Sequence, residues 1–210
     1  MSGILSVARG ESGHVRGFWR LKRLLARLGY DERNWLRVRQ IEAFEAFLRG
    51  RAETATALEI SPGWNSHWRK LPWRSYASVE YPVFDICRDV TGERYDVVIA
   101  DQVLEHVARP VQAAANIRQM LRPGGVALVA MPFLFRVHAR PHDYTRWTPA
   151  GLRQGLVDAG FSAERIHVEA WGNRACARAH LGGEVKPYGF WRDMRNEDEY
   201  PLMVWAFAEP

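Results

Sequence analysis

Short apolar runs alternate with amphipathic segments from residue 56 to the end of the chain. The run from Val97 to Ala100 lies between Asp96 and Asp101, as expected for a strand that is buried on both faces. Six further runs have the length and the apolar content of strands: Thr56 to Ile60, Ser78 to Pro82, Val83 to Cys87, Val126 to Met131, Arg165 to Trp171 and Leu202 to Ala208. The pattern therefore predicts a sheet of seven strands.

Helical spacing of apolar residues separates several of these strands. Pro110 is well placed to open a helix, and the residues from Arg122 to Gly125 (RPGG) would then force a turn. A second helix is predicted from Pro149 to Ala159, before Gly160. Strands and helices that alternate in this way favour a mostly parallel sheet with helices on both faces.

Two more helices are predicted near the N-terminus, over Phe18 to Leu28 and Trp35 to Leu48. We interpret residues 1–52 as a helical cap and residues 53–210 as one globular α/β domain. These helices carry more apolar residues than one sheet edge should need: Phe18, Trp19, Leu21, Leu24, Leu25, Leu28, Trp35, Phe44 and Phe47. The excess predicts a homodimer, since two-fold dimers are the commonest oligomers.

The charge and the cysteines bear on the cellular compartment and on the class of partner that the chain binds. The net charge of +5 comes from residues 1–55, with 11 basic against 6 acidic side chains, and we interpret this as a solvated helical face. No recognised nucleic-acid motif accompanies it. Cys87 and Cys176 belong to no ligand pattern, and no run approaches the ~20 apolar residues of a membrane span. The sequence predicts a cytoplasmic protein without a nucleic-acid partner.

Several motifs resemble those of class I S-adenosylmethionine (SAM) dependent methyltransferases. LEHV at residues 104–107 and RPGG at residues 122–125 are frequent in one large methyltransferase subgroup. The longer block LFRVHARPHDYTRWTPAGL, together with WGNR at residues 171–174, resembles actinobacterial sugar O-methyltransferases. That group includes an enzyme that methylates the reducing-end hydroxyl of methylmannose polysaccharide precursors. The resemblance covers about residues 55–208 and implies a Rossmann-like fold.

The resemblance also implies which residues meet the cofactor. In ALEISPG, Glu59 takes the place of the acid that ends the first strand, and Gly63 is the one surviving glycine of the usual glycine-rich turn. Glu80 takes the place of the acid that accepts the ribose hydroxyls, and Asp85 that of the acid near the adenine. Both could instead be ordinary exposed loop acids. The distance from Glu59 to Glu80 is typical of a strand-helix-strand unit, which favours the functional interpretation. Two further residues are expected on the sulfur side, Asp101 and Gln102.

The loop after the predicted strand at residues 126–131 is the most polar part of the chain. Such loops line the ligand crevice of an open parallel sheet, and transfer to a hydroxyl requires a group that takes up its proton. His142 is the leading candidate base because Asp143 could orient it, with His106 and His138 as alternatives. The substrate-binding candidates are Arg140, Tyr144, Arg146 and Trp147. Any of these histidines could instead bond only to backbone.

A divalent metal is a second way to acidify a hydroxyl. Glu105, His106 and His142 could supply its ligands if the two loops converge, and Mg²⁺ would suit a shell made mostly of oxygen. The same Glu-His pair also occurs in methyltransferases that use no metal.

The sequence therefore predicts a SAM-dependent O-methyltransferase that acts on a carbohydrate hydroxyl of the mannoside type. Six tryptophans in loop-like segments are candidates for stacking on a sugar: Trp64, Trp68, Trp73, Trp147, Trp171 and Trp191. Methylation of another small molecule, a lipid or RNA is the alternative within enzymes, because fold alone does not select the acceptor. The eroded glycine turn leaves a further alternative, a non-catalytic binding module with a methyltransferase fold.

Overall fold

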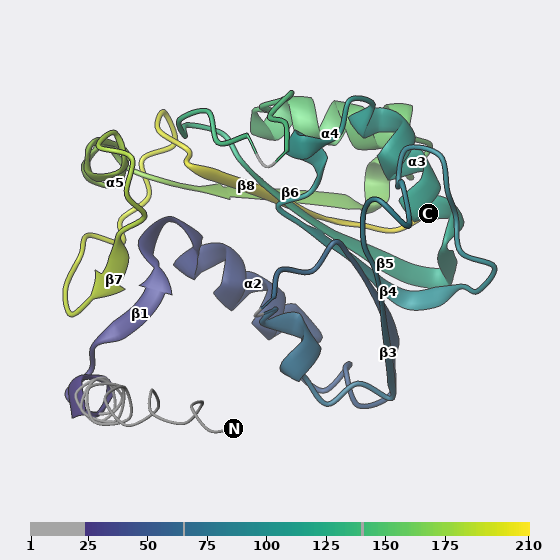
Figure 1. The fold of residues 1–210 in the computed structure, drawn as a ribbon, viewed down its shortest axis with the longest axis horizontal. Helices are drawn as coiled ribbons and strands as arrows, with labels where there is room; N and C mark the ends of the chain where they lie inside the picture. The colour runs from purple at the N-terminus through teal and green to yellow at the C-terminus, as the bar shows by residue number, and fades with distance from the viewer. Residues whose placement is uncertain (1–23, 65, 140) are drawn as a thin grey trace, which may run out of the picture.

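A six-stranded sheet forms the centre of this computed structural model, which describes residues 24–64, 66–139 and 141–210 (Figure 1). The strand order is β3-β2-β4-β5-β8-β6. The strands are β2 (Thr56–Ile60), β3 (Ser75–Val79), β4 (Tyr95–Asp101), β5 (Leu121–Pro132), β6 (Ile166–Trp171) and β8 (Met203–Ala208). The first four strands in this order are parallel, while β8 is antiparallel to both of its neighbours. The prediction of a mostly parallel sheet is confirmed.

The sheet has six strands among the described residues and not seven, because Val83 to Cys87 form turns. The side chains of this segment stabilise the turns: the Asp85 carboxylate accepts a hydrogen bond from the Cys87 backbone N–H at 3.0 Å. Val83 is 94% exposed, which a strand inside the sheet would not allow. The predicted strand at Ser78 to Pro82 is also shifted, since β3 begins at Ser75 and ends at Val79.

Helices cover both faces of the sheet, as predicted (Figure 1). Helices α3 (Pro110–Gln119) and α4 (Pro149–Asp158) pack on one face through Ile117, Leu152 and Leu156. Helices α2 (Val38–Leu48) and α5 (Arg174–His180) belong to the core on the other face. In the described part of the chain, four short 3₁₀ helices lie in the connections: η1 (Trp35–Arg37), η2 (Trp68–Lys70), η3 (Leu104–His106) and η4 (Ala163–Arg165).

The turn predicted at RPGG lies at the start of β5. Tyr95 pairs with Leu121 and Val97 pairs with Val126, so the intervening residues of β5 bulge out of register. Gly124 has φ +75°, and a Cβ atom on Gly125 would lie 3.0 Å from the Tyr95 carbonyl oxygen. Glycine is therefore required here by the close approach of the neighbouring strand.

The N-terminal segment belongs to the same core as the sheet. Strand β1 (Asp31–Asn34) pairs antiparallel with β7 (Pro187–Gly189), which joins the start of the chain to the long segment after β6. Trp35 and Phe44 are buried against the sheet, so they need no partner subunit. Leu24 and Leu28 are 54% and 65% exposed, while residues 18–23 of the first predicted helix lie outside the described residues.

No helix in the described part of the chain is long and apolar enough to cross a membrane. Both cysteines are free.

Candidate functional site

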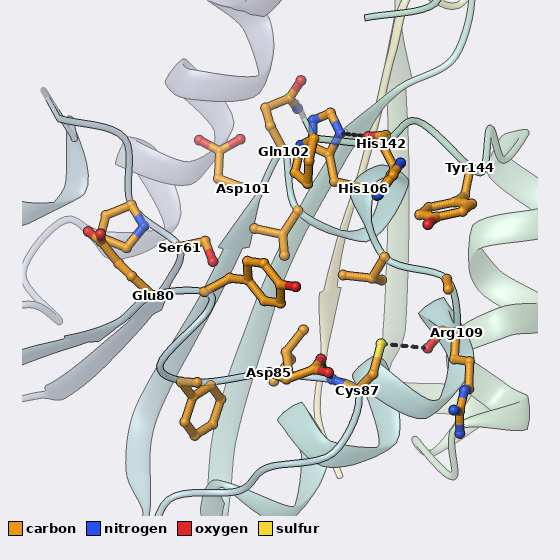
Figure 2. Close-up of a pocket in the computed structure, with 18 of the residues that line it drawn as sticks. Ser61, Glu80, Asp85, Cys87, Asp101, Gln102, His106, Arg109, His142 and Tyr144 are labelled. Carbon is orange, nitrogen blue, oxygen red and sulfur yellow. Dashed lines mark hydrogen bonds between the residues drawn. The ribbon is translucent and has the colours of Figure 1, made fainter. Parts of the chain in front are cut away.

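A cavity of about 750 Å³ opens at the carboxyl ends of β2, β3 and β4, where an open parallel sheet commonly binds its ligand (Figure 2). Eight predicted site residues line it: Gly63, Glu80, Asp85, Asp101, Gln102, His106, His142 and Tyr144. Ser61, which follows β2, lines it as well. Segments that are far apart in the chain thus meet at one edge of the sheet.

Two strand ends at this cavity have a left-handed backbone on residues that are not glycine. Ser61 follows β2 with φ +48°, and Gln102 follows β4 with φ +62°. Each is held by a backbone hydrogen bond to the neighbouring strand, Ser61 to Val79 at 2.7 Å and Gln102 to Ala130 at 2.8 Å. Such conformations are uncommon and cluster at functional sites, so they mark these strand ends as part of the site.

The segment between β2 and β3 agrees with the prediction in one respect and differs from it in another. Gly63 lines the cavity, as predicted. The spacing from Glu59 to Glu80 predicted a helix between β2 and β3, but the described residues there form only the 3₁₀ helix η2. The prediction of a strand-helix-strand unit is therefore wrong.

Glu59 does not line the cavity, contrary to its predicted contact with the cofactor. Its side chain is buried, and its carboxylate accepts hydrogen bonds from the hydroxyls of Ser66 at 2.7 Å and Tyr76 at 2.6 Å. Burial raises the pKa of Glu59, although these hydrogen bonds act in the opposite direction. Glu59 holds the turn after β2 against β3 and is better described as a structural residue.

Glu80 and Asp85 both line the cavity, from the segment that follows β3. Glu80 is exposed at the cavity (Figure 2). Arg69 interacts with it electrostatically, but the Glu80 carboxylate has no close ion pair or hydrogen bond among the described residues. Asp85 lies in a turn and not near the end of a strand, and its carboxylate is shared between the Cys87 N–H and the Arg88 guanidinium, 3.4 Å away. Glu80 is therefore the acid that is free to receive a ligand.

Asp101, at the end of β4, is bound on one side by two donors. Its Oδ2 atom accepts hydrogen bonds from Trp68 Nε1 at 2.8 Å and from Arg37 Nη2. Its Oδ1 atom is buried without a hydrogen-bond partner among the described residues, as is Nε2 of Gln102 next to it. Arg37 lines the cavity too, yet sequence reasoning missed it, because no spacing rule connects a residue of η1 with a strand end 64 positions later.

Three side chains form a cluster beside the part of the cavity that His106 lines. Glu105 and His106 lie on η3 directly after β4, and His138 comes from the loop after β5. One ligand atom of each, a carboxylate oxygen or a ring nitrogen, lies within 4.8 Å of the other two. The rings of His106 and His138 meet edge to face, with their centroids 4.9 Å apart. The predicted metal ligands thus converge in part, but His138 takes the place expected for the ring of His142.

Asp143 does not orient His142, which corrects its predicted role. Its carboxylate accepts a hydrogen bond from the His138 backbone N–H at 2.8 Å and ion-pairs with Arg146. Burial opposes its ionisation, but these hydrogen bonds outweigh that effect and lower the pKa of Asp143 to about 2. Asp143 is therefore a charged structural residue that fixes the loop around His138.

His142 lies at the cavity, as predicted, and its ring is close to that of Tyr144, with 5.2 Å between centroids. Its backbone carbonyl accepts a hydrogen bond from the ring of His106. The backbone N–H of Tyr144 donates to the Glu105 carbonyl at 2.7 Å. These two bonds join the loop after β5 to η3 and present His142 and Tyr144 to the same space.

Two of the other predicted substrate contacts, Arg146 and Trp147, do not line the cavity. Arg146 is occupied by Asp143, and Trp147 packs against Gly155 of α4 within the core. Arg140 lies outside the described residues. Two of the tryptophans proposed to stack on a sugar, Trp68 and Trp171, are buried in the core. Packing therefore explains three of the six tryptophans (Trp68, Trp147 and Trp171), whereas Trp64 and Trp191 are 96% and 85% exposed.

Comparison with known proteins identifies the fold. Residues 40–129 match the family described as a methyltransferase domain. The ubiquinone biosynthesis O-methyltransferase of Roseobacter denitrificans is 32% identical over 73 residues, which is 30% of this chain and 27% of that protein. The chain thus spans about a quarter of the length of that relative.

Two solved structures share the architecture at low sequence identity. An S-adenosylmethionine-dependent methyltransferase from Clostridium acetobutylicum superposes with a TM-score of 0.55 at 8% identity, over 94% of this chain and 99% of that one. Phosphoethanolamine N-methyltransferase 2 of Haemonchus contortus, solved with S-adenosyl-L-methionine, gives a TM-score of 0.52 at 11% identity, over 80% of this chain and 52% of that one. The chain therefore has the class I methyltransferase fold.

Proposed function

We propose that this chain is a SAM-dependent O-methyltransferase that binds SAM in the cavity at the ends of β2, β3 and β4. The observation that carries the proposal is the cavity itself: it combines the uncommitted Glu80 carboxylate with two left-handed strand ends in a methyltransferase fold. The position of the cavity agrees with the general rule for open α/β sheets.

The cavity offers complementary groups for the ribose and for the methionine part of SAM. The Glu80 carboxylate is suited to accept hydrogen bonds from the two ribose hydroxyls. At the other strand end, the free Oδ1 atom of Asp101 is suited to the methionine ammonium group, and Arg37 to its carboxylate. A zwitterion placed there would also satisfy an oxygen atom that is otherwise buried without a partner.

Transfer of the methyl group breaks its bond to sulfur and forms a bond to the acceptor oxygen, while the sulfonium leaves as a neutral thioether. The acceptor hydroxyl must lose its proton as this happens. His142 lines the cavity with an exposed side chain, and we assign it the role of proton acceptor. The alignment of oxygen, methyl and sulfur is the other contribution expected from the cavity.

We assign the acceptor to the carbohydrates, as the loop sequence and WGNR indicate. The term O-methyltransferase in the name of the matched relative supports an oxygen acceptor but gives no support to a sugar. Exposed polar and aromatic side chains of the cavity, including Tyr144, suit a hydroxyl-rich ligand. Another small molecule, a lipid, RNA or a purely binding role remain the alternatives to this assignment.

The test is transfer of an isotope-labelled methyl group from SAM to a panel of mono- and oligosaccharides, phenols and amines. We expect label in a sugar methyl ether, with no label in the amines. Label found only in phenols would replace the carbohydrate assignment and keep the O-methyltransferase. Absence of SAM binding in calorimetry would overturn the proposed activity and favour a binding module.

A further inference from the structure

We propose that Glu105, His106 and His138 bind one divalent transition-metal ion at the acceptor side of the cavity. The role we give this ion rests on the proposed methyl transfer, whereas the site itself rests on side-chain geometry alone. Oε1 of Glu105 lies 3.7 Å from Nε2 of His106 and 3.9 Å from Nε2 of His138. These three atoms surround a space that a metal ion could occupy after small side-chain shifts.

Glu105 is the strongest single observation. Its side chain is fully buried, and neither carboxylate oxygen accepts a hydrogen bond from another described residue. A buried carboxylate without a partner is costly, and proteins normally pair such a group or use it to coordinate a metal. The two nearest polar groups of the cluster are the ring nitrogens of the two histidines, which are themselves metal ligands.

His106 is oriented in the way that metal-binding histidines usually are. Its Nδ1 atom lies 2.5 Å from the backbone carbonyl oxygen of His142. A carbonyl oxygen can only accept, so Nδ1 carries a proton, and in the neutral imidazole the lone pair of Nε2 faces Glu105. Metal-binding histidines commonly donate the other ring N–H to a backbone carbonyl or a carboxylate, which fixes the tautomer.

His138 is flanked on its other nitrogen by Asp143 and by Arg146. Its Nδ1 atom lies 3.2 Å from Oδ2 of Asp143, and its own backbone N–H donates to that carboxylate. Arg146 neutralises Asp143, so the carboxylate holds the ring without adding an unpaired charge. Both histidines point Nε2 toward the buried carboxylate. His106 has a carbonyl acceptor behind it, whereas His138 Nδ1 accepts from the guanidinium of Arg146 at 3.2 Å. Metal binding through Nε2 of His138 therefore requires the other tautomer, in which Nδ1–H donates to Asp143.

The donor set does not fit the magnesium ion that the sequence led us to expect. Mg²⁺ prefers six oxygen ligands, while two imidazoles and one carboxylate are typical of Zn²⁺ and related transition metals. Three protein ligands leave at least one position for a water molecule or for the acceptor hydroxyl. When bound, such an ion would lower the pKa of a coordinated hydroxyl, and His142 would receive the proton.

The experiment titrates metal-free protein with Co²⁺ and with Zn²⁺, in the absence of SAM and acceptor. Calorimetry gives the stoichiometry, and the visible absorption of Co²⁺ reports its coordination. We expect one ion per chain and a loss of at least ~10-fold in affinity in Glu105→Gln and in His138→Gln, since even second-shell changes cost 10- to 100-fold. The matched control is His167→Gln, which removes an exposed histidine paired with Glu169 at 2.8 Å and should leave metal binding unchanged.

Two results would overturn the site: no stoichiometric binding by the folded wild-type protein, or binding that Glu105→Gln and His138→Gln leave intact. Circular dichroism shows whether each variant folds. If Glu105→Gln does not fold, His138→Gln serves as the second test. Because binding is measured without SAM, a metal-binding protein that transfers no methyl group would refute the proposed function and keep the site. Methyl transfer by a protein that binds no metal would do the reverse: it would refute the metal site and keep the proposed function, with His142 as the proton acceptor.

Discussion

The ring of His106 and the backbone carbonyl of His142 are joined by a hydrogen bond of 2.5 Å, although 36 positions separate them in the chain. The bond ties η3, which follows β4, to the loop that follows β5. A second hydrogen bond, from the Tyr144 N–H to the Glu105 carbonyl, links the same two segments. The acceptor side of the cavity is therefore one unit built from two loops, and a change in either should disturb both.

Replacement of Glu80 by alanine should weaken SAM binding. Removal of the carboxylate leaves two ribose hydroxyls without a charged acceptor, which typically costs about 1.5–3 kcal/mol. Calorimetric titration with SAM measures the loss, with Glu53→Ala as the control, because Glu53 is also exposed but lies away from the cavity. Equal affinity in Glu80→Ala and wild type would refute the assignment of Glu80 to the ribose.

Replacement of His142 by glutamine should lower turnover by ~10²–10⁴ while SAM affinity survives, because a general base acts in the transition state and the cofactor contacts lie on other segments. Initial rates with saturating SAM and controlled metal supply give the comparison. His167→Gln again serves as the control. Near-normal turnover in His142→Gln would transfer the role of base to His106.

Replacement of Asp143 by asparagine should lower the free energy of unfolding by about 3 kcal/mol, since it leaves the partly buried Arg146 without its counter-charge. Urea denaturation measures the change. Asp193→Asn removes a similar aspartate-arginine pair at the surface, where Arg195 is exposed, and should have little effect. A comparable loss in both variants would argue against a structural role specific to Asp143.

Replacement of Glu59 by glutamine should make the protein less sensitive to rising pH. Burial raises the pKa of Glu59 above its ordinary value of 4.5, so the folded protein holds this proton when the unfolded chain has already lost it. Stability should therefore fall as pH rises from about 4.5 through the raised pKa, and Glu59→Gln should remove that part of the decline. Thermal unfolding from pH 4 to pH 8 measures it. A difference in melting temperature that stays constant across this range would contradict the interpretation.

The homodimer stays a prediction, and it now depends on fewer residues. Leu24 and Leu28 are exposed before β1, whereas Trp35 and Phe44 are buried within the chain. Light scattering at micromolar concentration should give twice the mass of the 24.1 kDa chain. Leu28→Asp should shift it toward the monomer, because a charge in an apolar interface is costly. A monomer mass for the wild type would rule the dimer out.

The order of the main strands and helices could be predicted because each has a local signal. Apolar runs marked β2, β4 and β5, and proline at the first helical position marked α3 and α4. The segment from Val83 to Cys87 misled us, since its apolar residues resemble a strand while Asp85 and Asp89 stabilise turns through side-chain hydrogen bonds. Local composition does not show whether apolar packing in a strand or side-chain hydrogen bonding in a turn will prevail.

The location of the site could be predicted, but several individual roles could not. The rule that ligands bind at the carboxyl ends of parallel strands placed Glu80, Asp101 and His142 correctly at the cavity. Adjacency in sequence wrongly suggested that Asp143 orients His142. Neighbouring residues of an extended loop point in different directions, and the partner of Asp143 proved to be His138.

The absence of an α-helix between β2 and β3 in the described residues has a consequence for nucleotide selectivity. In dinucleotide-binding proteins a helix at this position directs its amino end, with its free N–H groups and partial positive charge, at the diphosphate. The short η2 provides no such anion trap, and SAM contains no phosphate that would need one. NAD⁺ and ATP share the adenosine moiety with SAM, yet they should compete poorly for this cavity. Displacement of bound SAM by either nucleotide at similar concentration would show that discrimination arises elsewhere.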